Sequence, residues 1–132
     1  MDHLSERQIL VLREQLEQER ARLLAELESW EGQIRAVDAE PDAQDAAVRD
    51  AERATLAEQV RHARARTREQ ELALERMREG VYGLCEDSEE EIPFPRLRAE
   101  PTARYTVEAA ERLEARRGPS PTAARSDDDG PY

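Results

Sequence analysis

Asp42 and Asp45 follow Pro41 closely, at the point where a long helical pattern in the sequence stops. A carboxylate here can accept hydrogen bonds from the first amides of a following helix, and Asp45 is well placed to do so. Because aspartate is short, the same carboxylates can also present negative charge at a position fixed by the backbone. The rest of the sequence contains no nucleophile–base pair, phosphate-binding loop or metal cluster, so we do not expect an enzyme.

The segments on either side of this acidic pair both have the apolar periodicity of paired helices. The first begins with a predicted capping box, Ser5-Glu-Arg-Gln8, and the second covers about Asp45–Glu79. Pro41 separates them and leaves a predicted loop over Asp38–Gln44. Two helices of about 30–35 residues joined by a short loop pair antiparallel. The expected seam consists of Ile9, Leu12, Leu16, Leu23, Leu27, Trp30, Ile34 and Val37 in the first helix, and of Leu56, Val60, Ala63, Thr67, Leu74, Met77 and Val81 in the second helix and just beyond it.

After Gly80, which can end the second helix, the helical pattern gives way to short segments. We expect extended or turn structure there, without helix around Phe94, because prolines flank it on both sides. Thr106 is a predicted N-cap of a short helix that ends near Arg117. The predicted fold is therefore mainly α: a hairpin over 1–79 with its tip at 38–47, a compact region over 80–117, and a disordered tail over 118–132.

Composition limits the cellular locations and the classes of binding partner that we expect for this protein. The 132 residues carry a formal net charge of -11, which does not favour nucleic-acid binding, so we expect no sequence-specific DNA recognition. Cys85 is the only cysteine, so no intramolecular disulfide can form. No apolar run reaches the roughly 20 residues that span a membrane, and the first residues lack a signal-peptide core. The expected location is the cytoplasm, away from membranes.

Two stretches of the compact region resemble a known family. Glu79-Gly-Val-Tyr-Gly-Leu-Cys-Glu-Asp-Ser-Glu-Glu-Glu-Ile and Arg96-Leu-Arg-Ala-Glu-Pro-Thr-Ala-Arg-Tyr are similar to the zinc-finger region of the DksA/TraR family, bacterial regulators that bind RNA polymerase. The family's hairpin carries Asp-x-x-Asp-x-Ala at its end. Asp42-Ala-Gln-Asp45-Ala-Ala47 fits that pattern where the heptads break.

The resemblance also shows two departures from the family. The four zinc-ligand positions read Cys85, Ser88, Thr106 and Ala109, and one thiol, two hydroxyls and a methyl do not supply the donors that structural zinc needs. We therefore expect no metal and no other cofactor, and Cys85 should be a small buried residue. Packing must then hold the region together, through Tyr82, Leu84, Ile92, Phe94, Leu97, Tyr105 and Leu113.

The second departure concerns guanosine tetraphosphate, the alarmone with which many family members act. Basic residues that hold its phosphates in the family correspond here to Glu69, Glu100 and Ala110. Two acidic replacements repel a polyphosphate, so the resemblance implies a weak or absent response to the alarmone.

By resemblance, the chain is a monomer that inserts its hairpin into the secondary channel of bacterial RNA polymerase. Asp42 and Asp45 would approach the catalytic region, and Ala47 would lie where a larger side chain clashes with the polymerase. One alternative is a Gre-type transcript-cleavage factor, whose tip carboxylates position a metal in the polymerase. Another is a dimeric coiled-coil scaffold, although Arg20 interrupts the seam that a tight dimer needs.

Overall fold

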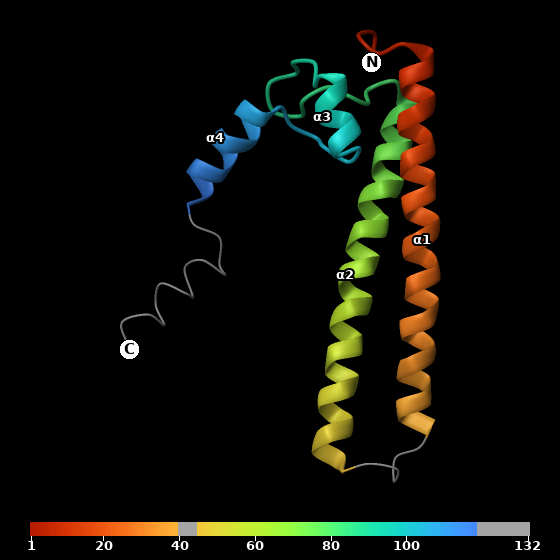
Figure 1. Ribbon diagram of the computed structural model, residues 1–132. Coiled ribbons are helices and arrows are strands. Elements are labelled where there is room, and N and C mark those ends of the chain that lie inside the picture. The colour runs from red at the N-terminus through yellow and green to blue at the C-terminus, as the bar shows by residue number, and fades with distance from the viewer. Residues whose placement is uncertain (40–44, 119–132) are drawn as a thin grey trace.

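The chain folds as a long helical hairpin with a small compact region at its open end (Figure 1). The computed structural model describes residues 1–39 and 45–118. Helices α1 (Glu6–Ala39) and α2 (Ala46–Glu79) have 34 residues each, so each is about 50 Å long. Two shorter helices follow, α3 (Phe94–Ala99) and α4 (Val107–Arg117). The predicted mainly helical hairpin is confirmed.

Beyond the helices, the described ranges contain little regular structure. Across them no strand forms, and Leu84 and Glu91 make only an isolated antiparallel bridge. No helix within these ranges combines the length and the apolar character needed to cross a membrane. The predicted tail beyond Gly118 and residues 40–44 of the predicted loop lie outside the described residues. Asp38 and Ala39, which were also predicted as loop, instead continue α1, because Pro41 restricts only the residue before it.

Capping interactions fix the helix ends where the sequence predicts them. Ser5 and Gln8 form the reciprocal capping box, with Gln8 N donating to Ser5 Oγ at 3.0 Å and Ser5 N donating to Gln8 Oε1 at 2.9 Å. Gly80 ends α2 in the left-handed conformation with φ 79°, and its N–H donates to Met77 O at 3.2 Å. The local sequence alone therefore accounts for these boundaries.

The predicted seam is correct except near the open end of the hairpin. There the buried residues of α2 are Gln70, Ala73 and Met77, whereas Leu74 is half-buried and Val81 is 44% exposed. Val81 lies past the end of the helix, so it cannot continue the helical periodicity. A small residue, Ala73, occupies the fully buried position, where it packs against core residues of the compact region.

The core consists of two separate clusters along the hairpin. The larger cluster joins the open end to the compact region, and the smaller lies midway and contains Leu23, Leu27, Val60 and Ala63. Among the described residues nearer the tip, none is buried beyond Leu27 on α1 or before Leu56 on α2. The hairpin is thus firmly packed at its base and thinly packed towards its tip.

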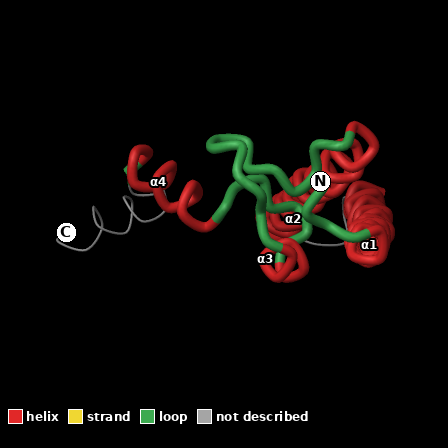
Figure 2. The backbone as a smooth tube through the Cα atoms, turned by 90° about the horizontal axis from the view of Figure 1, so that it is seen from above, coloured by secondary structure: helices red, strands yellow, loops and turns green. Residues whose placement is uncertain are grey.

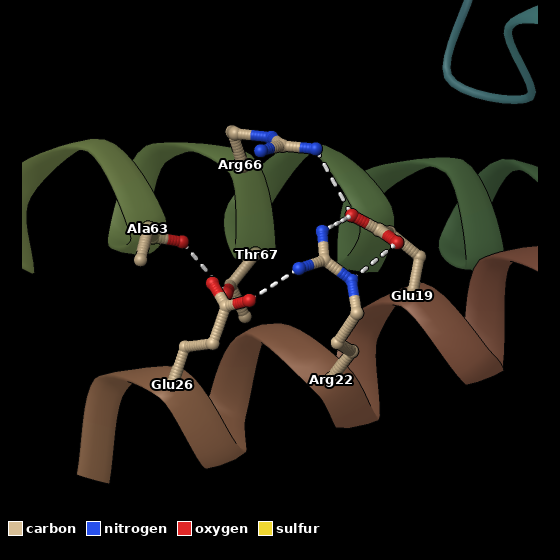
Figure 3. Close-up of polar contacts among 6 residues, drawn as sticks. All are labelled: Glu19, Arg22, Glu26, Ala63, Arg66 and Thr67. Atoms are coloured by element: carbon tan, nitrogen blue, oxygen red, sulfur yellow. Dashed lines mark hydrogen bonds and ion pairs between the residues drawn. The ribbon is translucent and has the colours of Figure 1, made fainter. Parts of the chain in front are cut away.

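Ion pairs also join the two helices at several points along the hairpin. Arg66 reaches from α2 to Glu19 on α1 at 3.0 Å, and Glu19 also pairs with Arg22, which in turn contacts Glu26 (Figure 3). Arg20, which interrupts the seam, lies 3.2 Å from Glu71 across the hairpin. Two further cross-helix pairs lie nearer the tip, Arg64–Glu31 at 3.0 Å and Arg53–Asp38 at 2.9 Å.

Helix α3 corrects the prediction that prolines exclude helix around Phe94. Pro93 is the N-cap and Pro95 lies in the first turn, where a helix needs no amide donor. Leu97 N donates to Pro93 O at 3.2 Å, which closes the first turn. The side chain of Leu97 is fully buried in the larger core cluster.

The N-terminal segment fastens the compact region to the hairpin. The ring Nε2 of His3 lies 2.8 Å from Ile92 O, and Leu4 is buried in the larger core cluster. Gly83 has φ 82°, and a Cβ built there would lie 3.2 Å from His3 Cε1 and 3.3 Å from Leu4 Cδ1. This tight contact and the positive φ together favour glycine at position 83. Helix α4 extends from the compact region away from α1, as the view along the hairpin shows (Figure 2).

Candidate functional site

The end of the hairpin opposite the compact region carries the predicted acidic tip (Figure 1). Asp45 is the N-cap of α2, and its Oδ1 accepts a hydrogen bond from Ala47 N at 2.8 Å. Asp45 and Ala47 are both exposed. Asp42 lies outside the described residues. Because one carboxylate oxygen makes the cap, Asp45 can cap the helix and still present charge to a partner.

Two features near this tip were missed in the sequence. Val48, in the first turn of α2, is 56% exposed. Asp38 and Arg53 form an ion pair between the helices, in which Arg53 Nε donates to Asp38 Oδ1 at 2.9 Å and Nη2 donates to Oδ2 at 3.3 Å. The spacing of apolar residues predicts the seam between the helices, but it carries no information about a charged pair on the outer edge of the hairpin.

Three of the four predicted zinc-ligand positions meet in the buried centre of the compact region. Thr106 N donates to Cys85 Sγ at 3.4 Å, and Thr106 Oγ1 lies 4.0 Å from the same sulfur. Thr106 Oγ1 also accepts from Ala109 N at 3.2 Å and so caps α4. Ser88 is half-buried beside them, and its Oγ accepts from Glu90 N at 3.4 Å. Hydrogen bonds therefore join these positions.

The surroundings of Cys85 favour its thiolate. Burial raises the pKa of the thiol, but hydrogen bonds from Ser88 and from the backbone amides of Thr106 and Asp87 outweigh it and lower the pKa to about 7. The residue is only 2% exposed, as the sequence predicts for a small core residue. Its sulfur therefore acts as a hydrogen-bond acceptor inside the core.

Glu69, Glu100 and Ala110, far apart in the sequence, line one cleft of about 480 Å³ between α2 and the compact region. The same cleft contains three arginines that the sequence analysis did not single out. Arg96 and Arg104 each have an acidic partner, at 3.8 Å from Glu100 and 3.4 Å from Glu86 respectively. Arg76 is half-buried, and burial lowers its pKa. The cleft therefore has mixed charge.

Comparisons with known proteins agree with the sequence pattern. The family described as prokaryotic dksA/traR C4-type zinc finger matches residues 80–115. Over 44 residues the chain is 52% identical to the RNA polymerase-binding transcription factor DksA of Caulobacter vibrioides, and over 37 residues it is 57% identical to general stress protein 16O of Bacillus subtilis. These alignments cover 33% and 28% of this chain, but only 31% and 23% of the relatives' own lengths.

A solved structure extends the similarity to nearly the whole molecule. Transcription factor DksA2 from Pseudomonas aeruginosa superposes with a TM-score of 0.80 at 32% sequence identity, covering 86% of this chain and 88% of the other. The chain belongs to the DksA/TraR family.

Membership of the DksA/TraR family raises the question of zinc, which its C4-type finger implies. The residues present do not fit the ion. Cys85 offers one thiol, Ala109 offers no donor, and the hydroxyl of Thr106 is already engaged by Ala109 N. Within the described ranges, no cluster of three or more His, Cys, Asp or Glu side chains is arranged to hold a metal. In this DksA/TraR member, the groups at the centre of the finger, Cys85, Thr106 and Ala109, are joined by hydrogen bonds.

Proposed function

We propose that this protein is a transcription regulator that binds bacterial RNA polymerase through the secondary channel, in the cytoplasm and as a monomer. In this proposal the hairpin enters the channel, Asp42 and Asp45 approach the active centre, and certain promoter complexes become less stable. The chain itself performs no catalysis and makes no sequence-specific contact with DNA.

The exposed carboxylate of Asp45, at the end of an arm about 50 Å long, is the observation that carries the proposal. An arm of that length can deliver charge deep into a large enzyme. The matched DksA of Caulobacter vibrioides is named as RNA polymerase-binding, and the similarity to DksA2 extends over the hairpin as well as the finger.

We further propose that the regulator works without zinc and responds weakly, if at all, to guanosine tetraphosphate. The donor set around Cys85 supports the first part. The cleft that contains Glu69 and Glu100 supports the second, because both carboxylates repel phosphates and because Arg96 and Arg104 already have acidic partners.

Competition binding to RNA polymerase tests the docking directly. The protein should displace a labelled hairpin factor from the polymerase, with an affinity that changes little on adding the alarmone or a zinc chelator. Failure to bind polymerase would overturn the proposal, and a stable dimer that ignores polymerase in light scattering would favour the scaffold alternative.

Asp45→Asn separates the charge of the tip from its capping role. Asparagine caps helices nearly as well as aspartate, so we expect the helix and the binding to polymerase to survive. The effect on promoter complexes in a transcription assay should be lost, because the negative charge is gone. Full activity of Asp45→Asn would show that the charge at the tip is not the working element.

A transcript-cleavage assay on backtracked polymerase addresses the remaining alternative. A Gre-type factor would stimulate vigorous RNA cleavage, whereas the regulator proposed here should leave the transcript intact. Cleavage that depends on Asp42 and Asp45 would replace the proposal with that alternative.

A further inference from the structure

We infer that Arg53 is a positioning residue: its ion pair with Asp38 sets the direction of the first turns of α2, which carry Asp45 and Ala47. The inference rests on the function proposed for the tip, but the pair itself is a feature of the described structure. Its geometry is bidentate, with two donors of one guanidinium bonded to the two oxygens of one carboxylate.

The location of the pair gives it this role. Asp38 lies in the last turn of α1. Arg53 lies about two turns into α2, which begins at Ala46. Figure 1 shows α2 reaching slightly beyond α1 at this end. The pair is therefore near the last place where α1 lies against α2.

Apolar packing does not duplicate the pair. The smaller core cluster ends with half-buried Trp30 and Ile34 on α1, and none of the described residues from Ala46 to Thr55 is buried. Hydrogen bonding by Arg53 lowers the pKa of Asp38, and the positive charge of Arg49 lowers it further. Arginine is suited to this task because its planar fork fixes orientation as well as distance.

An exposed ion pair contributes little to overall stability, and both partners here are about half exposed. The consequence of losing it should therefore be local. Arg53→Ala should leave the melting temperature unchanged, while amide hydrogen exchange in α2 next to the tip rises about two- to five-fold. The amide of Arg49, which donates to Asp45 O at 3.0 Å, is one of the probes.

Three further variants make the exchange measurement specific. Arg53→Lys should restore part of the protection, because it keeps the charge but not the fork. The double variant Asp38→Asn/Arg53→Ala should raise amide exchange near the tip no more than either single change does, as expected for two partners of one interaction. Arg64→Ala removes a comparable cross-helix pair, with Glu31, beside the buried Ala63, and should leave exchange near the tip unchanged.

A functional measurement completes the test. With polymerase, Arg53→Ala should bind like wild type but have a weaker effect on promoter complexes, and Arg53→Lys should recover part of that effect. Unchanged exchange in Arg53→Ala, or an equal rise in Arg64→Ala, would overturn the inference. If the wild-type protein does not bind polymerase, the proposed function fails, and the exchange experiment still decides whether Arg53 holds the helix end.

Discussion

The sulfur of Cys85 lies where a zinc finger of this family would hold its metal, but its neighbours here are hydrogen-bond donors. Thr106 supplies one of them and also caps α4 with its hydroxyl. One residue thus links the sulfur to the start of the following helix. This linkage connects the centre of the finger to α4 through hydrogen bonds.

The pKa of Cys85 leads to a prediction about pH. A thiol whose pKa is about 7 when folded and 9.0 when unfolded stabilises the folded state only where the thiolate forms. The contribution should be fully present above pH 9 and should be lost as the pH falls to about 7. Urea unfolding of wild type and Cys85→Ala, compared across this range, measures the difference. If the two stabilities change in parallel with pH, hydrogen bonding does not hold a thiolate in the core.

At the scale of single elements, α4 depends on Thr106 more than on its own packing. Ala109 is its only buried residue, and the N–H of Ala109 is bonded to the Thr106 hydroxyl. We expect Thr106→Ala to destabilise the protein by about 1 kcal/mol in chemical denaturation, and Thr106→Ser to recover most of the loss.

Thr55→Ala is a suitable control for the Thr106 substitution. The Thr55 hydroxyl donates to Ala51 O on the exposed face of α2, so its removal should change stability by less than about 0.5 kcal/mol. Equal effects of the two substitutions would show that the cap and sulfur contacts of Thr106 contribute no more to stability than a hydrogen bond on an exposed helix face.

Local chemistry explains which elements could be predicted from the sequence. The caps at Ser5, Asp45, Gly80 and Thr106 each depend on nearby residues, so the sequence was enough to locate the start of α1, both ends of α2 and the start of α4. Helix α3 was missed because a proline was read only as a helix breaker, although it also suits a first turn.

The features that the sequence did not reveal depend on contacts between distant segments. Burial of Ala73 depends on its packing in the cluster that also contains residues of the compact region. Arg76 joins the cleft beside Glu100 only because α2 lies against that region. The tip pair Asp38–Arg53 likewise requires the register of the two helices. Periodicity within one segment carries no information about these contacts.

At the scale of the whole molecule, the hairpin base and the compact region share one core. Leu12 and Leu16 of α1 belong to the same cluster as Tyr82 and Ile92. We therefore expect Ile92→Ala, which should cost about 2–5 kcal/mol, to lower the midpoints of both regions together. Far-UV circular dichroism reports the helices, and tyrosine near-UV signals report the compact region.

A change at an exposed apolar residue provides the comparison for Ile92. Val107 is 46% exposed, so Val107→Ala should shift neither midpoint appreciably. Loss of the tyrosine signal at a lower denaturant concentration than the helical signal would mean that the compact region unfolds independently, contrary to the shared core.

The close approach at Gly83 has a consequence for how this sequence can diverge. A side chain there would press against His3 and Leu4, which would have to shift slightly, and it would also require an unfavourable positive φ. A change at position 83 therefore strains the attachment of the N-terminal segment to the compact region. Among homologues that retain this attachment, including the contact of His3 with the backbone of Ile92, glycine should therefore predominate at this position.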